Sequence, residues 1–378
     1  MKNYSESLHT LEDLGGVYLL LGPACNMTCR HCTQTPIKNC FDLSPQGKDL
    51  SQDVKEFIVK WSKSHWKYGE KNPKRFYFWG GEPLLYWETI KKLVLEFESL
   101  GVKGLSYRIF SNGLLLNDEV VEFCNAHDIW FIMSLDAPNL TAVRNAVPSE
   151  DKLELFLKIK KRTVNTVFNA INNNMIIAMK ALEYLLPGTE VTCGFINVLS
   201  DIPKDIYDFK PGEAYKAVTE LGIYMLQSGN KYMLKWFTSK LWRMYHWDKD
   251  EFIEYPYPPC HPGMVSISVD FKGNVYRCHN DSFKVGRITE DFNILQDKHL
   301  EQWKKLLPHK CLECQHLDIC RCICPIAVKQ DGQLCYCDYL REFWQGVKDI
   351  AAISQTIKSG SKYSIAYVNG RLKVKEVE

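Results

Sequence analysis

Three cysteines near the N-terminus follow directly on an apolar segment and share one short loop. They are Cys25, Cys29 and Cys32, in the spacing C-x3-C-x2-C. Three thiolates are one fewer than the four that fill the ligand set of a 4Fe-4S cluster, so such a cluster would keep one iron open for an outside ligand. A zinc knuckle is the alternative that the three cysteines by themselves leave open.

A second group of cysteines lies toward the C-terminus. Nine of the fifteen cysteines fall between Cys260 and Cys337. Cys260, Gly273 and Cys278 have the spacing C-x12-G-x4-C, and a later run has the spacing C-x2-C-x5-C-x3-C before Cys337. The N-terminus lacks the basic stretch and apolar run of a secretory signal, so these cysteines are better explained by metal binding than by disulfides.

The first cysteine spacing resembles that of the radical SAM (S-adenosylmethionine) superfamily. A second motif supports the resemblance, because Gly80-Gly81-Glu82-Pro83 follows a predicted strand and is similar to the GGEP segment of that family. The resemblance implies that SAM chelates the open iron, that one electron splits SAM into methionine and a 5′-deoxyadenosyl radical, and that the radical takes a hydrogen atom from the substrate. A non-catalytic metal-binding or scaffold protein is the opposing hypothesis, and the intact cysteines beside Glu82 argue against it.

The resemblance also implies a set of SAM-binding residues, each placed just after a predicted strand or inside the cysteine loop. They are His31, Gly80, Gly81, Glu82, Pro83, Ser111, Asn112, Ser134 and Asp136. His31 occupies the position where the family often has an aromatic residue near the adenine, and an exposed loop histidine is the alternative. Ordinary turns or caps are the alternative for the segments around Asn112 and Asp136.

The C-terminal cysteines resemble the seven-cysteine pattern of the SPASM domain, which usually holds two auxiliary iron-sulfur clusters. The resemblance implies one cluster held by Cys311, Cys314, Cys320 and Cys337, and another held by Cys260, Cys278 and Cys324. The second set lacks a fourth thiolate, for which Cys322 and Cys335 are spare candidates. An open iron there could bind a substrate thiolate or pass electrons, and a purely zinc-bound domain is the alternative.

Radical SAM proteins with a SPASM domain mostly modify peptides or proteins, so the resemblance implies a peptide or protein substrate and an oxidative modification such as a crosslink or thioether. It also implies a reductant such as flavodoxin or ferredoxin. Many peptide-modifying members of the family begin with a small domain that binds the leader peptide of the substrate, whereas only sixteen residues precede the first predicted strand here. Either a separate protein delivers the substrate or no such protein is needed.

His279 is a candidate catalytic base. The sulfatase-maturing branch has an aspartate there, which makes formylglycine formation the runner-up, and a small-molecule radical dehydrogenase is a further alternative.

The elements that must position these residues alternate between strand and helix. Apolar and β-branched runs predict six strands, at Val17–Leu21, Arg75–Trp79, Leu105–Phe110, Ile129–Ser134, Glu190–Leu199 and about Gly222–Gln227. Such an alternation predicts an α/β fold, a partial (β/α)6 TIM-type barrel whose reactive site lies at the carboxyl ends of the strands. A small cysteine-rich domain with a β-hairpin around Gly273 follows it.

We therefore expect an N-terminal extension over 1–15, a radical SAM core over 16–250, an auxiliary-cluster domain over 251–345 and a C-terminal tail over 346–378. The stretch Lys152–Leu186 reads as helical, although five asparagines weaken that reading. The end of the tail is polar and Lys-rich, typical of a solvated terminus.

The formal net charge of +2 gives no basic field, and no apolar run is long enough for a membrane span. We expect a cytoplasmic protein without nucleic-acid or membrane partners.

Overall fold

The structure, a computed structural model, describes most of the chain with several gaps. The described residues are 11–12, 14–34, 49–65, 73–195, 202–228, 266–280, 282–306, 314, 337–354, 362–368 and 371–377. The expected metal ligands Cys260, Cys311, Cys320 and Cys324 lie outside these residues, as do Cys322 and Cys335. Among the described helices, none has the length and apolar character needed to cross a bilayer.

A nine-stranded sheet organises the fold, with the strand order β6-β5-β4-β3-β2-β1-β7-β8-β9. Its strands are β1 (Gly16–Gly22), β2 (Lys74–Gly80), β3 (Leu105–Ser111), β4 (Trp130–Ser134), β5 (Arg162–Phe168), β6 (Glu190–Phe195), β7 (Ser266–Asp270), β8 (Asn274–Tyr276) and β9 (Lys284–Arg287). Neighbouring strands from β6 to β7 are parallel, and β7, β8 and β9 form antiparallel pairs. The expected partial barrel is confirmed, and the carboxyl ends of its parallel strands meet at one edge.

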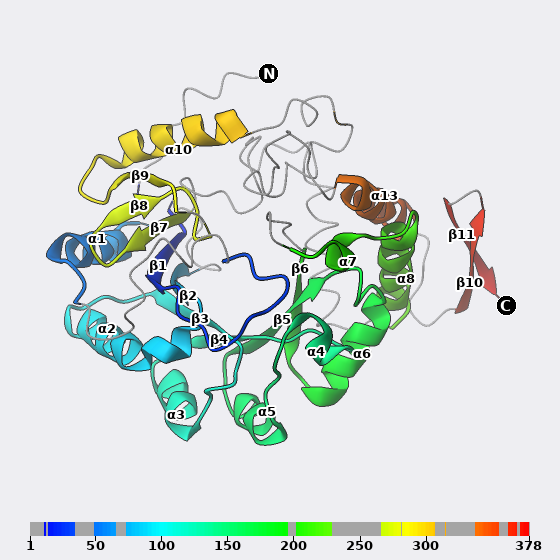
Figure 1. Cartoon of the computed structure of the whole chain (residues 1–378), viewed down its shortest axis with the longest axis horizontal. Helices are drawn as coiled ribbons and strands as arrows, with labels where there is room; N and C mark the ends of the chain where they lie inside the picture. Colours follow the sequence, from blue (N-terminus) through cyan, green and yellow to red (C-terminus); the bar gives the residue numbers. More distant parts are fainter. Residues whose placement is uncertain are drawn as a thin grey trace.

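Helices cover the outer face of the curved sheet, and the loop after β1 crosses its open end (Figure 1). The helices are α1 (Gln52–Lys63), η2 (Pro83–Tyr86), α2 (Trp87–Ser99), α3 (Asp118–Ala126), α4 (Leu140–Val143), α5 (Glu150–Leu157), α6 (Met175–Leu185), α7 (Lys204–Tyr207), α8 (Glu213–Ser228), α10 (Phe292–Leu306) and α13 (Cys337–Ser354). In α2 the buried residues Ile90, Leu93, Val94 and Phe97 recur at helical spacing, so that one face packs on the sheet.

The strands alternate between two environments. In β1, Val17 and Leu19 are completely buried, whereas Tyr18 between them is half-buried. Successive side chains of a strand point to opposite faces, so the fully buried residues contact the helices and Tyr18 faces the inside of the barrel. The inner face is thus the less tightly packed of the two, which suits a barrel that opens at one end.

The stretch Lys152–Leu186 is not one helix, and our sequence-based expectation was wrong there. It contains α5, the strand β5 and α6. The segment Arg162–Phe168 is rich in β-branched residues and fits between β4 and β6. The asparagines mark the turns, since Asn174 accepts a hydrogen bond from the Ile177 N–H at the start of α6 and Asn169 accepts two in the loop before it. Within the barrel, β5 is the strand that the sequence analysis missed.

Gly222–Gln227, expected to be a strand, lies inside the helix α8. Residues on most of its circumference are buried, among them Val218, Leu221, Ile223 and Met225, because α8 packs beside both α6 and α13. When a helix is buried on several sides, its apolar residues no longer recur every three or four positions, so its sequence resembles that of a buried strand. The strands β1 to β6 still number six, because β5, which was not expected, makes up for the sixth strand that was expected at Gly222–Gln227.

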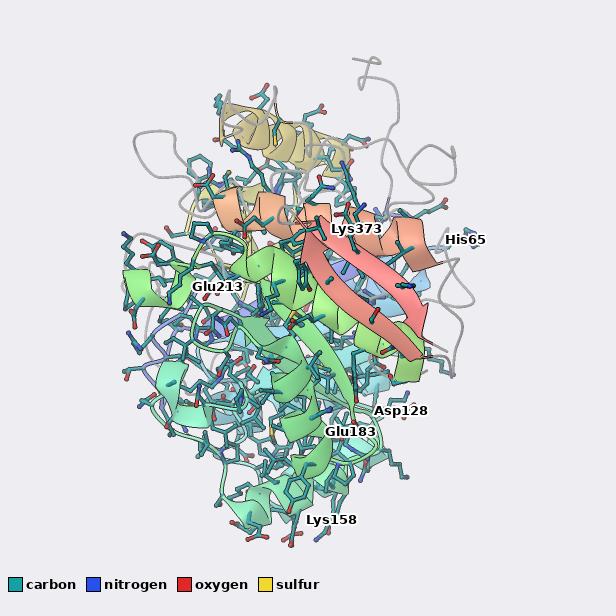
Figure 2. All side chains as sticks on the ribbon, turned by 90° about the vertical axis from the view of Figure 1, so that its right-hand side faces the viewer. His65, Asp128, Lys158, Glu183, Glu213 and Lys373 are labelled. Carbon is teal, nitrogen blue, oxygen red and sulfur yellow. The ribbon has the colours of Figure 1, made fainter. Side chains whose placement is uncertain are left out.

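The C-terminal hairpin formed by β7 and β8 was expected, and its turn is confirmed. Gly273 has a φ of +83°, a conformation that glycine adopts at no steric cost. The hairpin joins the main sheet, because β7 pairs in parallel with β1 and Tyr18 lies opposite Ser268. The end of the chain differs from the expected solvated tail. There β10 (Lys362–Val368) and β11 (Arg371–Val377) form a second hairpin against α8, labelled by Lys373 in Figure 2.

Candidate active site at the carboxyl ends of the strands

The cysteine loop begins where β1 ends and lies over the open end of the sheet. Cys25, Cys29 and Cys32 are half-buried. The loop is anchored by its own backbone to the segment that follows β4. The Arg30 N–H donates to the Val143 carbonyl at 2.8 Å and the Thr28 N–H donates to the Asn145 side chain at 2.8 Å. A segment more than one hundred residues later in the chain therefore fixes the position of the cysteine loop.

The turn Gly80-Gly81-Glu82 lies directly against this loop. The Gly81 N–H donates to the Gly22 carbonyl at 2.9 Å, and the Glu82 N–H donates to the Ala24 carbonyl at 2.8 Å. A Cβ atom added to Gly81 would lie 2.3 Å from the Ala24 oxygen. Only glycine permits this approach of two backbones. Pro83 then opens the short helix η2.

We expect Gly81→Ala to disturb the cysteine loop, because the added methyl group would meet backbone atoms that cannot swing away. The expected result is a loss of about 1–3 kcal/mol in the free energy of unfolding, as for other overpacked sites, together with poor iron incorporation. Urea unfolding of the apoprotein and iron analysis after reconstitution measure both. Gly16→Ala is the matched control, since the nearest atom to its added Cβ lies at 3.4 Å, an ordinary van der Waals distance, and Gly16 does not have a positive φ; equal losses in the two variants would contradict this assignment.

Glu82 ties this turn to the turn after β3. Its carboxylate is 1% exposed and accepts three hydrogen bonds, from the Ser111 hydroxyl at 2.8 Å, the Asn112 N–H at 2.8 Å and the Leu84 N–H at 3.0 Å. Burial raises the pKa of Glu82, and the three hydrogen bonds oppose that rise. The Asn112 side chain also donates to Asn26 of the cysteine loop at 2.8 Å. Glu82, Ser111 and Asn112 are thus brought together beside the loop, as their positions after two strands predicted.

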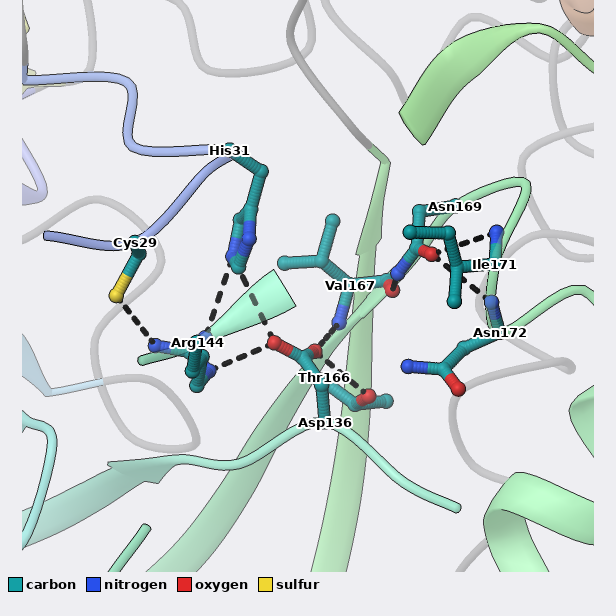
Figure 3. Close-up of polar contacts among 9 residues, drawn as sticks. All are labelled: Cys29, His31, Asp136, Arg144, Thr166, Val167, Asn169, Ile171 and Asn172. Carbon is teal, nitrogen blue, oxygen red and sulfur yellow. Dashed lines mark hydrogen bonds and ion pairs between the residues drawn. The ribbon is translucent and has the colours of Figure 1, made fainter. Parts of the chain in front are cut away.

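A charged group lies on the other side of the loop, with Arg144 at its centre (Figure 3). The Arg144 side chain donates through Nε to the Asp136 carboxylate at 2.7 Å and through Nη1 to the Cys29 sulfur at 3.8 Å. Its Nη2 lies 3.4 Å from His31 Nε2. His31 is 7% exposed, so the alternative of an exposed loop histidine was wrong. Burial lowers the pKa of His31 to about 4, which leaves its ring neutral near pH 7.

Asp136 anchors this group from the end of β4. Its carboxylate is fully buried and accepts further hydrogen bonds from the Val167 N–H at 2.7 Å and the Thr166 hydroxyl at 3.1 Å, both in β5. The Ser134 side chain, two residues earlier, is half-buried and lies opposite Asn165 of the same strand. These contacts hold Asp136 toward Arg144. A direct contact of Ser134 or Asp136 with SAM stays a prediction.

His279, which follows the C-terminal hairpin, packs against aromatic side chains on the inner face of the barrel. The His279 ring stacks on Tyr18 of β1 at a centroid distance of 4.3 Å and meets Trp79 of β2 edge-on at 4.4 Å. Burial lowers the pKa of His279 to about 4. The preceding residue, Cys278, is an expected auxiliary ligand and is buried.

Cys314 and Cys337, two further expected cluster ligands, both interact with Arg341. The Arg341 side chain hydrogen-bonds to Cys314 and interacts electrostatically with Cys337, the first residue of α13. Both cysteines are half-buried. Their common neighbour agrees with the expectation that they serve the same cluster, which stays a prediction.

Comparison with known proteins bears on the family of the chain. Residues 19–177 match the sequence profile of the radical SAM superfamily. The chain contains a radical SAM domain. The matched residues include the cysteine loop, the Gly-Gly-Glu turn, Asp136 and Arg144, so the whole arrangement around the three thiols belongs to this domain.

Proteins similar to most of the chain include one radical SAM enzyme and two solved structures. The chain is 20% identical over 361 residues to the radical SAM cyclopropyl synthase TigE of Paramaledivibacter caminithermalis, which covers 88% of this chain and 72% of TigE. Native anSMEcpe with bound AdoMet superposes with a TM-score of 0.65 at 18% identity, over 91% of this chain and all of that one. Streptococcus suis SuiB bound to its precursor peptide SuiA gives a TM-score of 0.56 at 14% identity, over 83% of this chain and 72% of SuiB. At such identities the two structures show a common fold.

A radical SAM domain implies a 4Fe-4S cluster and SAM, and the donor set around the loop fits the cluster. Burial raises the pKa of the Cys25 and Cys29 thiols, so a bound metal is what would hold them as thiolates. Within the described ranges, no three His, Cys, Asp or Glu side chains converge as ligands of a single metal ion would. A 4Fe-4S cluster distributes its ligands over separate irons, so this spread does not count against it.

Arg144 is the residue of this site that the sequence analysis did not single out. It lies eight positions after Asp136, outside every motif, and reaches Cys29 only through the folding of the chain. Arg30, inside the loop, forms an ion pair with Asp205, in which Nη2 donates to the two carboxylate oxygens at 2.8 and 2.7 Å. Neither contact had a signal in the sequence that could have found it.

Proposed function

We propose that this radical SAM enzyme cleaves SAM reductively and takes a hydrogen atom from a peptide or protein substrate, which is thereby oxidatively modified. The observation that supports the first part best is the position of the three thiols, which lie between the Gly-Gly-Glu turn and the Asp136–Arg144 pair at one end of the barrel. When bound there, the cluster would supply the electron for SAM cleavage. Cys25, Cys29 and Cys32 would hold it, with SAM at the open iron.

The proposal of a peptide substrate rests first on the relatives. SuiB has been solved with its precursor peptide, and anSMEcpe with AdoMet and a peptide. TigE is a radical SAM cyclopropyl synthase. None of these proteins is closely related to the chain. They favour a peptide because the structural similarity to SuiB and anSMEcpe extends over at least 83% of the chain, well beyond the radical SAM domain.

The inner face of the sheet supports the same proposal. Tyr18 stacks on Tyr77 at 4.2 Å, and Trp79 meets Phe110 edge-on at 5.1 Å. Tyr18, Trp79 and Phe110 are half-buried, whereas the outward-facing residues of the same strands are fully buried. Aromatic side chains that stay partly exposed offer apolar surface and ring faces to a substrate side chain.

His279, which follows the C-terminal hairpin, contacts two of these aromatic side chains, Tyr18 and Trp79. We infer that His279 also contacts the substrate, because it lies on this partly exposed aromatic surface and directly follows the expected cluster ligand Cys278. A neutral imidazole can accept a proton from an oxidising substrate. The auxiliary clusters of Cys278, Cys314 and Cys337 with their partners, and a flavodoxin or ferredoxin as reductant, belong to the same proposal.

Co-expression with short peptides encoded beside the gene tests the substrate class. We expect one such peptide to lose about two mass units per modification, because removal of two hydrogens forms one new bond. High-resolution mass spectrometry of the peptide detects the change, and a Cys29→Ala enzyme is the control that should leave the peptide unmodified. A sulfatase peptide as the one oxidised substrate would favour the formylglycine reaction, and oxidation of small molecules alone would contradict the proposal.

A further inference from the structure

The Arg144 guanidinium connects the cysteine loop to the core of the barrel. Each of its three nitrogens has a different neighbour, the Asp136 carboxylate at 2.7 Å, the Cys29 sulfur at 3.8 Å and the His31 ring nitrogen at 3.4 Å. The residue is 8% exposed and Asp136 is completely buried. The cation is therefore held beside one cysteine of the loop, where water screens its charge only weakly.

The geometry of the guanidinium makes this a directed contact. The group is planar, always charged and able to donate several hydrogen bonds in fixed directions. Asp136 fixes its orientation through Nε, and β5 in turn fixes Asp136 through the Val167 N–H and the Thr166 hydroxyl. Two strands thus aim one N–H of Arg144 at the sulfur of Cys29.

We propose that Arg144 raises the reduction potential of the cluster that Cys25, Cys29 and Cys32 would hold, through its positive charge and its N–H···S hydrogen bond to Cys29. The inference rests on the proposed reductive cleavage of SAM. Reduction by one electron makes the cluster one unit more negative, and a nearby cation stabilises the more negative state. Hydrogen bonds to the sulfurs and the local net charge are known determinants of such potentials.

Asp136 sets the size of this effect. Its carboxylate lies on the far side of the guanidinium from Cys29 and offsets part of the positive charge (Figure 3). The two charged residues should therefore act in opposite directions on the potential, which a general loosening of the site would not do.

A redox titration followed by EPR spectroscopy of the reduced cluster tests the proposal in the anaerobically reconstituted full-length chain. Arg144→Gln is expected to lower the midpoint by at least a tenfold change in the reduction equilibrium, about 59 mV for one electron. Asp136→Asn is expected to raise it. Arg30→Gln is the control, because it removes the same charge from the cysteine loop itself, but at a side chain that is 41% exposed and paired with Asp205. Its shift should stay below threefold.

A full iron content with an unchanged midpoint in Arg144→Gln would overturn the inference. Where that variant does not retain its cluster, an unchanged midpoint in Asp136→Asn would overturn it as well. Wild-type protein labelled with 15N-arginine gives a readout without any substitution. Pulsed EPR should detect a weak 15N coupling to the reduced cluster, and its absence would contradict the hydrogen bond. Failure of the wild type to cleave SAM would instead refute the proposed function.

Discussion

Cys29→Ala is expected to remove about four irons per chain and to lower 5′-deoxyadenosine formation by more than about a hundredfold. Loss of an outer-shell partner of a metal site already costs about 10–100-fold, and here a ligand itself is lost. The thiol is free, half-buried and next to Arg144, which the loss of Cys29 would leave without its sulfur partner. Iron analysis after anaerobic reconstitution and quantification of 5′-deoxyadenosine by liquid chromatography measure the two effects.

Cys124→Ala is the matched control for this experiment. Cys124 lies in α3, is 1% exposed, and has a pKa raised to about 12 by burial, so it behaves as an apolar core residue. The control should keep its iron and its SAM cleavage. A Cys29→Ala protein with the same iron content and product formation as this control would contradict the assignment of Cys29 as a cluster ligand.

Glu82→Ala is expected to lower the free energy of unfolding of the apoprotein by about 2–4 kcal/mol and to weaken SAM binding at least tenfold. The substitution leaves the Ser111 hydroxyl and the N–H groups of Asn112 and Leu84 without their buried acceptor, and each such loss costs about 1–3 kcal/mol before the structure relaxes. It also disconnects the Gly-Gly-Glu turn from the turn after β3. Urea unfolding and equilibrium dialysis with labelled SAM measure the two quantities.

Two variants separate the buried contacts of Glu82 from a general effect of charge. Glu82→Gln keeps one acceptor oxygen and should lose about half as much stability as the alanine variant. Glu88→Ala removes a carboxylate that is 82% exposed and paired with Lys91, so it should change stability by less than about 0.5 kcal/mol. Equal stability of Glu82→Ala and wild type would refute the role of Glu82 as a link between two turns.

The residues that could be predicted from sequence are those whose function depends on local spacing. Cys25, Cys29 and Cys32 lie within eight residues of one another, and the glycines of the Gly-Gly-Glu turn follow an obvious strand. The hairpin around Gly273 was also predictable, since two short apolar runs flank a turn signal. Such patterns are short, and the fold that surrounds them does not change their meaning.

The contacts that sequence could not supply join segments far apart in the chain. Arg144 meets a cysteine 115 residues earlier, and nothing in its neighbours indicates this. The same holds for α8, whose packing against two other helices obscures its periodicity. The β-branched residues of β5 indicated a strand, but the asparagines around them suggested a weak helix. In the structure these asparagines mark the end of the strand and the cap of α6.

Reductive cleavage of SAM is the central claim, and product stoichiometry tests it most directly. Anaerobically reconstituted protein should, with dithionite and SAM, yield 5′-deoxyadenosine and methionine in equal amounts, and Cys29→Ala should yield neither above background. A wild-type protein with a complete iron content and bound SAM that forms no 5′-deoxyadenosine would contradict the account. So would a protein whose N-terminal cysteines hold zinc after purification without oxygen.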